Sequence, residues 1–241
     1  MWRYVDFSKF VALLRDGALY FARADRLGDR FEGARGLATR KEEWKAYCLD
    51  YFRQAIRSAP GQTENIAAEL MEEQTERLFR DFEARGEREV KSTYVTCWHA
   101  NDGESEALWR LYAPPDTAGI ALRAEFGALD AGLDTTFDVE FGYVQYVDFA
   151  SRFAGTYDRI FWKRASLSHE TEVRGVIAPH MTRSSDETGV LVPLDLSRGI
   201  KAVVISPFAP IWFADVVRTT LQKFGIGLSV QPSSLLAEPF F

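Results

Sequence analysis

Cysteine and histidine are both scarce in this sequence of 241 residues, and their scarcity excludes several kinds of site. The two cysteines, Cys48 and Cys97, are too few for a disulfide framework and are typical of a protein from a reducing compartment. The three histidines, His99, His169 and His180, lack the i, i+4 spacing of a His-Glu-x-x-His zinc helix. Cys97 and His99 alone do not make a zinc site, so we expect no bound metal.

Long apolar stretches and an excess of basic charge are also lacking. No run approaches the ~20 apolar residues that span a bilayer, and the first residues lack the basic-then-apolar layout of a secretion signal. We therefore expect a soluble, cytoplasmic protein without a membrane partner. The formal net charge of −6 argues against a broad nucleic-acid surface, because phosphate binding requires clustered basic groups.

Several common catalytic motifs are missing. The sequence has no Gly-x-Ser-x-Gly elbow and no lysine of the P-loop type after a glycine-rich loop. The segment Gly225-Ile226-Gly227 lacks the third glycine and the strand-then-helix context of a dinucleotide fingerprint. Ser168, His169 and Glu170 have the residue types of a hydrolase triad, but neighbouring side chains on a strand point to opposite faces. These absences argue against the commonest hydrolase, Rossmann and P-loop enzymes.

The residues that are present predict an α+β fold. A content of 46% hydrophobic and 14% aromatic residues is sufficient for a substantial core, and we expect one domain over residues 1–241. Helical periodicity and the break at Pro60-Gly61 predict a helical insertion over residues 40–88, after the first strand, at 18–24. Further strands, which together predict a mixed or antiparallel central sheet, are expected at 92–98, 119–124, 139–146, 170–174, 201–206 and 228–231.

The predicted strand 170–174 is unusually polar. Alternation along a strand places Glu170, Glu172 and Arg174 on one face, with neighbours on that face ~7 Å apart. Two carboxylates so placed can act differently, one on a substrate hydroxyl and one on a developing cation. Arg174 would keep one of them ionised, and Lys163 would add a second positive charge. The alternative is a solvent-facing strand with ordinary salt bridges.

Aromatic and polar residues are also mixed in the segment 98–112, next to a predicted strand end, where sites tend to lie. Trp98 ends the strand, and Trp109 and Tyr112 lie three residues apart on one face of a predicted helix. These side chains either contribute to a binding site or pack in the core, as aromatic pairs at this spacing usually do.

The loop 25–33 combines acidic residues with glycine. Asp25, Asp29 and Glu32 are typical turn-forming and capping residues. The alternative is a magnesium site, which would need their carboxylates to converge.

Several short blocks of the sequence form a specific combination: residues 2–4, 19–25, 29–33, 97–99, 106–113, 119–122, 163, 169–174 and 205–207. Together they resemble a large bacterial family, domain of unknown function twenty-nine seventy-one. The resemblance covers nearly the whole chain apart from the helical insertion. Arg30 departs from it, because the family's loop is expected to have the form Asp-Pro-Phe-Glu.

The order of the polar motifs is similar, more distantly, to that of ADP-ribosyltransferases. Their cores have an early strand with Arg or His, a second polar strand and a late Glu-x-Glu. Here Arg23, residues 96–98 and residues 170–172 follow that order. The resemblance implies a split sheet and NAD as the substrate.

The same resemblance implies roles for the candidate residues. Glu172 would stabilise an oxocarbenium-like ribose, and Glu170 would orient the nucleophile of the acceptor. Arg23 would hold the NAD phosphates. The other groups expected in the nucleotide-binding site are Lys163, Arg174 and a stacking ring from Trp98, Trp109 or Tyr112.

These roles predict an NAD-utilising ADP-ribosyltransferase or NAD glycohydrolase, of toxin, effector or defence type, with an unidentified macromolecular acceptor. Two other functions stay open. The first is a non-catalytic sensor or binding module that holds a nucleotide, another small molecule or a protein in the same cleft. The second is an effector directed at nucleic acid, which the acidic balance disfavours.

Overall fold

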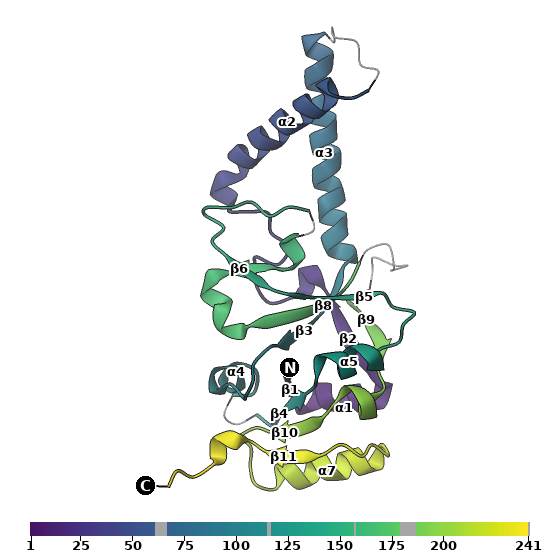
Figure 1. Ribbon diagram of the computed structural model, residues 1–241, viewed down its shortest axis with the longest axis vertical. Helices are drawn as coiled ribbons and strands as arrows, with labels where there is room; N and C mark the ends of the chain where they lie inside the picture. The colour runs from purple at the N-terminus through teal and green to yellow at the C-terminus, as the bar shows by residue number, and fades with distance from the viewer. Residues whose placement is uncertain (61–66, 115–116, 157, 179–186, 241) are drawn as a thin grey trace.

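The computed structural model describes residues 1–60, 67–114, 117–156, 158–178 and 187–240 (Figure 1). Gly61 and His180, named above, lie outside these residues. The described part is an α+β fold with a mixed, mostly antiparallel sheet. Its main sheet has nine strands: β1 (Trp2–Asp6), β2 (Ala18–Arg23), β3 (Tyr94–His99), β4 (Gly119–Arg123), β5 (Val139–Tyr143), β8 (Glu172–Ile177), β9 (Gly189–Pro193), β10 (Ala202–Ile205) and β11 (Val230–Pro232).

A second, two-stranded sheet and the helices complete the described fold. The small sheet pairs β6 (Gln145–Val147) with β7 (Trp162–Arg164) in parallel. The α-helices are α1 (Phe7–Asp16), α2 (Lys41–Arg57), α3 (Ala68–Ser92), α4 (Glu106–Tyr112), α5 (Phe126–Gly132), α6 (Leu196–Gly199) and α7 (Phe213–Lys223). The 3-10 helices are η1 (Ala24–Arg26), η2 (Ala38–Arg40), η3 (Asp158–Ile160), η4 (Ala165–Glu170) and η6 (Ser234–Leu236). Among these helices none is both long and apolar enough for a membrane span.

The main sheet forks at β3. One edge of β3 pairs with β8 along residues 94–99. The other edge pairs with β1 at His99 and with β2 at Tyr94 and Val95, so β1 and β2 diverge from it. Arg3 lies in the fork and donates hydrogen bonds to the Thr96 hydroxyl of β3 and, at 3.4 Å, to the Tyr20 carbonyl of β2. A half-buried cation thus bridges the two branches.

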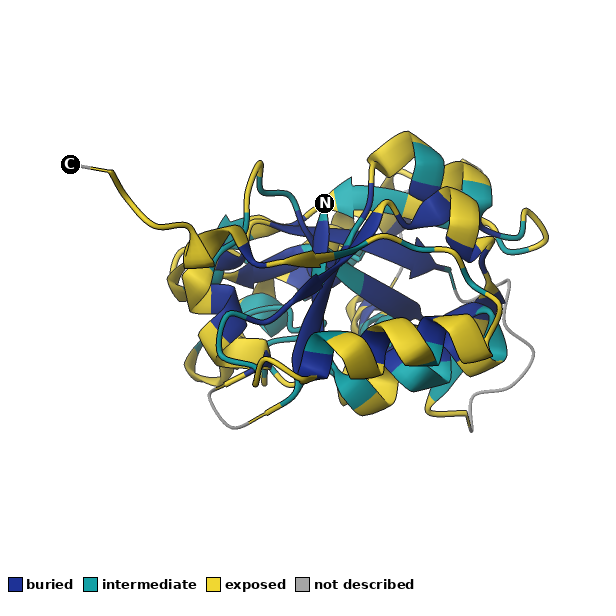
Figure 2. Ribbon diagram, turned by 90° about the horizontal axis from the view of Figure 1, so that it is seen from below, coloured by how far each residue is buried: buried dark blue, intermediate teal, exposed yellow. Residues whose placement is uncertain are grey.

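Helices α1, α5, α6 and α7 cover one face of the sheet, and the main core lies between them and the strands. Figure 2 shows that the strands are largely buried, whereas the outer faces of the helices are exposed. Helix α1 begins where the Asp6 carboxylate accepts a hydrogen bond from the Lys9 amide at 2.8 Å. It ends at Gly17, whose φ of 56° is the left-handed conformation that glycine adopts without strain. Core residues from these elements include Phe10, Leu14, Phe21, Trp98, Ile120, Leu129, Leu196 and Phe213.

Helices α2 and α3 form the insertion and project away from the sheet (Figure 1). Ion pairs join them, among them Arg53 with Glu72 at 2.8 Å. The insertion follows the strand at 18–23, as predicted, but that strand is the second of the sheet, because residues 2–6, not predicted as a strand, form β1. It also continues to Ser92 rather than to residue 88. Five residues with mixed polarity carry little strand signal, and β1 depends on its pairing with β4.

The other face of the sheet carries polar side chains between two apolar clusters. Below α4, the first cluster contains Trp2, Tyr4, Leu108, Trp109 and Ala121. The second contains Ala24, Val95, Ile160 and Val176. Between the two clusters, strand register places Cys97 opposite Arg174 and His99 opposite Glu172. Polar groups are therefore enclosed by packed apolar residues on both sides.

Candidate functional site

The predicted strand 170–174 is wrong at its first two residues. Glu170 ends η4, Thr171 has φ 41° and ψ 51°, and β8 begins only at Glu172. A left-handed conformation is unusual for a β-branched residue such as Thr171. Two hydrogen bonds hold it, from the Ala100 amide to the Thr171 carbonyl at 2.9 Å and from the Thr171 hydroxyl to Asn101 Oδ1 at 2.5 Å. This backbone reversal, rather than strand alternation, turns Glu170 towards Glu172.

Both carboxylates bind the same ammonium group. Lys163 Nζ on β7 lies 2.6 Å from Glu170 Oε2 and 2.6 Å from Glu172 Oε2. Glu172 Oε1 also accepts a hydrogen bond from Arg174 Nε at 2.6 Å. Glu172 is thus held at both oxygens. Glu170 has no protein partner for Oε1 within the described part of the chain, so the two carboxylates are equipped for different tasks.

Glu32 is a fifth member of this charged cluster, which we define as Glu32, Lys163, Glu170, Glu172 and Arg174. Its oxygens lie 2.8 Å from Arg174 Nη2 and 2.8 Å from Arg174 Nη1 in a bidentate pair. No sequence pattern indicated that Glu32 lies beside Arg174, because the two are 142 residues apart. The available sequence signal was its position in the loop block 29–33, which combines acidic residues with glycine.

The other acidic residues of this loop lie apart from the cluster. Asp29 pairs with Arg164 at 2.7 Å, and Asp25 pairs with Arg23 at 2.7 Å. Among the residues that the structure describes, no three His, Cys, Asp or Glu side chains are grouped to hold a metal ion. The residues of the loop therefore act as separate ion-pair partners.

Arg23 does not meet the predicted carboxylates. In the sheet it pairs with Tyr94, which belongs to the main core and lies five residues before His99. Side chains five apart on a strand point to opposite faces, so Arg23 lies on the face opposite Glu172. The prediction that Arg23 contacts a ligand beside Glu172 is therefore wrong, because the strand register places the two residues on opposite faces.

The three residues predicted to stack on a ligand, Trp98, Trp109 and Tyr112, have three different environments in the structure. Trp98 is fully buried in the main core on the opposite face, since it pairs with Val173 rather than with Glu172. Trp109 is fully buried below α4, with its ring 4.8 Å from that of Tyr4, which corresponds to the core-packing alternative. Tyr112 alone of the three is partly open, at 40% exposure, and its ring lies 5.6 Å from that of His99.

The cluster carries one more negative than positive group, since three carboxylates face two cations. Burial by itself would raise the pKa of Glu172, but Arg174 and Lys163 outweigh it and hold that pKa at about 2. Burial would lower the pKa of Lys163, but Glu172 and Glu170 raise it above its usual value. For Glu32 burial prevails and raises the pKa. At neutral pH Glu172 is therefore ionised and Lys163 is charged.

Three further polar groups border the cluster and were missed as candidates. His99 Nδ1 lies 2.7 Å from the Glu170 carbonyl, and burial lowers the pKa of His99, so its neutral ring donates from Nδ1 and leaves Nε2 as an acceptor. Tyr146 Oη accepts a hydrogen bond from the Glu172 amide at 2.8 Å. Burial and Glu172 raise the pKa of the Cys97 thiol. The sequence contained a signal for two of these groups, because Cys97 and His99 lie two residues apart on a predicted strand and therefore share a face.

Acidification is expected to destabilise the protein in two steps. The lowered pKa of His99 means that the unfolded chain binds the proton first, so stability falls as the pH drops below 6.5. Glu172, with a pKa of about 2 against 4.5 when unperturbed, then loses its contribution as the pH falls between these values. Glu32, with its raised pKa, opposes the second step. Urea midpoints measured from about pH 7 to about pH 3 test this order, and His99→Asn should remove the first step. A midpoint that rises on acidification from neutral pH would contradict it.

Cavities bordered by described residues beside the cluster include the following pair, and neither is lined by Glu170 or Glu172. One, of about 710 Å³, is lined by residues that include Gly142, Ile160 and Trp162. The other, of about 530 Å³, lies between the loop after β2 and helix α3. Comparisons of the chain with protein-family models, curated proteins and solved structures found no match.

Proposed function

We propose that this protein is an NAD-utilising enzyme of the ADP-ribosyltransferase or NAD glycohydrolase type, with Glu170 and Glu172 as its catalytic carboxylates. The observation that carries the proposal is their unequal environment. Lys163 binds both at 2.6 Å, while Arg174 binds Glu172 alone. One carboxylate is thereby fixed as a charge, and the other keeps an oxygen for a reacting group.

In the proposed reaction the bond between ribose C1′ and the nicotinamide nitrogen breaks. Its electron pair leaves with neutral nicotinamide, and the ribose becomes an oxocarbenium-like cation. Water or the hydroxyl or amine of an acceptor then forms the new bond to C1′ and releases a proton. Glu170, through Oε1, is the group placed to orient that nucleophile and accept its proton.

Glu172 serves as the fixed negative charge. Its pKa of about 2 keeps it ionised throughout the neutral range. The cluster has one excess negative charge in an enclosed setting, where a developing cation is stabilised more strongly than in water. Each carboxylate oxygen also has a second lone pair, so Glu172 can accept a hydrogen bond from a ribose hydroxyl while it remains paired.

Tyr112 takes the stacking role for which Trp98 and Trp109 were also considered. The half-open ring of Tyr112, beside His99, is the aromatic face available to nicotinamide or adenine. Arg3 contacts Thr96 of β3, and Arg23 pairs with Asp25. Strand register places both arginines on the face opposite Glu172, so neither faces a ligand beside Glu172. The forked sheet also supports the proposal, since the motif order implies a split sheet.

One observation favours a second candidate, a non-catalytic binding module. The side chains of the charged cluster are each exposed by no more than 9% and are paired with one another. Such a network can be purely structural, with ligand binding located elsewhere.

Incubation with NAD separates the two candidates. An enzyme is expected to release nicotinamide, measured by chromatography, and to be stabilised by NAD in thermal melting. Mass action predicts stabilisation of ~2.7 kcal/mol at a hundredfold excess over the dissociation constant. Stabilisation without nicotinamide release identifies a binding module. If NAD has neither effect, the proposal is wrong.

A further inference from the structure

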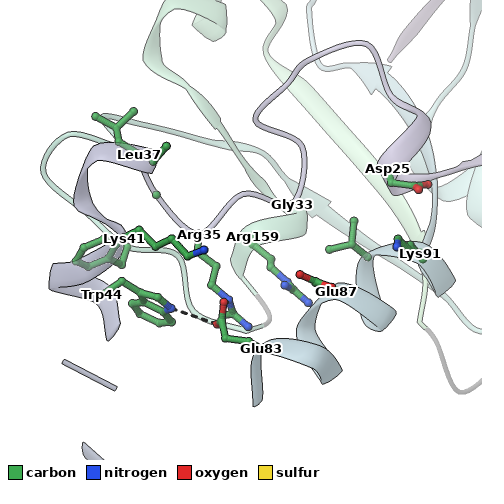
Figure 3. Close-up of a pocket in the computed structure, with 14 residues that line it drawn as sticks. Asp25, Gly33, Arg35, Leu37, Lys41, Trp44, Glu83, Glu87, Lys91 and Arg159 are labelled. Carbon is green, nitrogen blue, oxygen red and sulfur yellow. Dashed lines mark hydrogen bonds and ion pairs between the residues drawn. The ribbon is translucent and has the colours of Figure 1, made fainter. Parts of the chain in front are cut away.

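The cavity of about 530 Å³ is a second place in the molecule where polar groups converge (Figure 3). Its walls come from the loop after β2, the start of α2, the second half of α3 and the segment 153–159. The charged side chains that line it are Arg35, Lys41, Lys91 and Arg159 against Asp25, Glu83 and Glu87. Asp25 pairs with Arg23 and Arg159 pairs with Glu89, and both partners lie outside this set, so three cations remain against Glu83 and Glu87.

Two guanidinium groups meet at one point of this cavity. Gly86 of α3 has no side chain there, and a Cβ on it would collide with Arg35 Nη2 and come within 3.0 Å of Arg159 Nη1. The close-up shows the ends of Arg35 and Arg159 converging beside α3 (Figure 3). The charge of Arg35, together with burial as the larger cause, lowers the pKa of Arg159. Two like charges are therefore held side by side where water has little access.

Both arginines also keep hydrogen-bond donors without a partner. Arg35 Nη1 and Nη2 and Arg159 Nε are buried and unpaired within the described residues. Two other donors have partners: Arg35 Nε binds Glu83 at 3.0 Å, and Arg159 Nη2 binds the Gly86 carbonyl at 2.6 Å and the Glu89 carboxylate at 3.1 Å. A buried donor without a partner is costly and in a native protein points to an unseen water or ion.

We propose that the cavity binds the phosphate group of a small ligand, held between Arg35 and Arg159. A phosphate presents several acceptor oxygens in different directions, which suits guanidinium groups that arrive from two chain segments. Lys41 and Lys91 supply further positive charge at the walls. Trp44 and Phe153, whose rings lie 5.3 Å apart, line the same cavity and offer an apolar wall to the rest of the ligand.

Two chain segments connect this phosphate site to the charged cluster. Gly33 lines the cavity, while its neighbour Glu32 binds Arg174. Arg159 lines the cavity, while the carbonyl of its neighbour Ile160 accepts a hydrogen bond from Arg174. A ligand at the phosphate site therefore contacts the same loops that hold Arg174 in place.

Calorimetric titration of the full chain at constant ionic strength tests the site, with inorganic phosphate, ribose 5-phosphate and AMP as probes. Wild-type protein is expected to bind at least one of them, and Arg35→Gln to weaken binding by about tenfold or more, as expected for loss of charged hydrogen bonds. Gly86→Ala should weaken it as well by displacing Arg35, while alanine favours the helix and keeps the protein folded. Arg80→Gln, an exposed arginine of α3 outside the cavity, is the matched control and should bind like wild type.

The three probes distinguish the source of the phosphate. Equal affinities for all three probes indicate that the ligand is free phosphate. If AMP and ribose 5-phosphate bind equally and both bind more tightly than phosphate, the ligand is a sugar phosphate. If AMP binds most tightly, the ligand is a nucleotide. The proposal is overturned if none of the three binds, or if Gly86→Ala binds as tightly as wild type. It is also overturned if Arg80→Gln weakens binding as much as Gly86→Ala does. NAD cleavage is not required for any of these results, so they are independent of the proposed enzyme activity.

Discussion

Replacing Arg174 with methionine is expected to lower the free energy of unfolding by about 3–5 kcal/mol, because the change leaves buried carboxylates without their cation. Arg174 is 1% exposed and binds Glu172 through Nε and Glu32 through both terminal nitrogens. Methionine has similar length and flexibility, so the loss reports mainly the missing charge and hydrogen bonds. Chemical denaturation at neutral pH measures it.

Arg110→Met is the matched control for this experiment. Arg110 pairs with Glu106 one helical turn away, and both side chains are 57% exposed. An exposed pair of this kind contributes little, so the change in stability should stay within about 0.5 kcal/mol. A loss of similar size in the two variants would mean that the charged cluster is not a buried network.

A second replacement, at Glu32, tests whether Arg174 stabilises the protein through its contact with that residue. Burial raises the pKa of Glu32, so Glu32 without Arg174 is an unfavourable buried acid. Adding Glu32→Gln to Arg174→Met should therefore recover part of the lost stability. Additive losses would contradict the direct coupling of these residues.

Replacing Glu172 with glutamine is expected to slow nicotinamide release from NAD by about 10²–10³-fold, the usual effect of removing one preorganised electrostatic contact to a transition state. Glutamine keeps the shape of the side chain and can still accept a hydrogen bond from Lys163. It removes the negative charge that the proposed reaction needs opposite the ribose cation. The rate constant for nicotinamide release measures the effect.

Glu140→Gln is the matched control, because Glu140 is an exposed glutamate on the neighbouring strand β5. It should release nicotinamide at the wild-type rate. Thermal melting and circular dichroism establish that Glu172→Gln is folded, since the change leaves Lys163 and Arg174 with less compensating charge. A folded Glu172→Gln protein with undiminished turnover would rule out the catalytic role of Glu172.

Local pattern was a good guide to the elements with strong periodicity. The helical insertion, the helix that carries Tyr112 and the strand around Val203 follow from apolar spacing, and all are present. Local pattern failed for β1, whose five residues depend on pairing with β4. It also failed at Thr171, because nothing in a β-branched residue predicts a left-handed backbone conformation.

The polar composition of residues 170–174 and the presence of Lys163 were evident in the sequence itself, and so was the α+β character of the fold. The tertiary structure decided which of these groups meet. Strand register placed Arg23 and Trp98 on the far face, and folding of the loop after β2 brought Glu32 to Arg174 across 142 residues. Periodicity determines which side chains share a face of one element, whereas contacts between distant segments depend on register and packing, which no local pattern encodes.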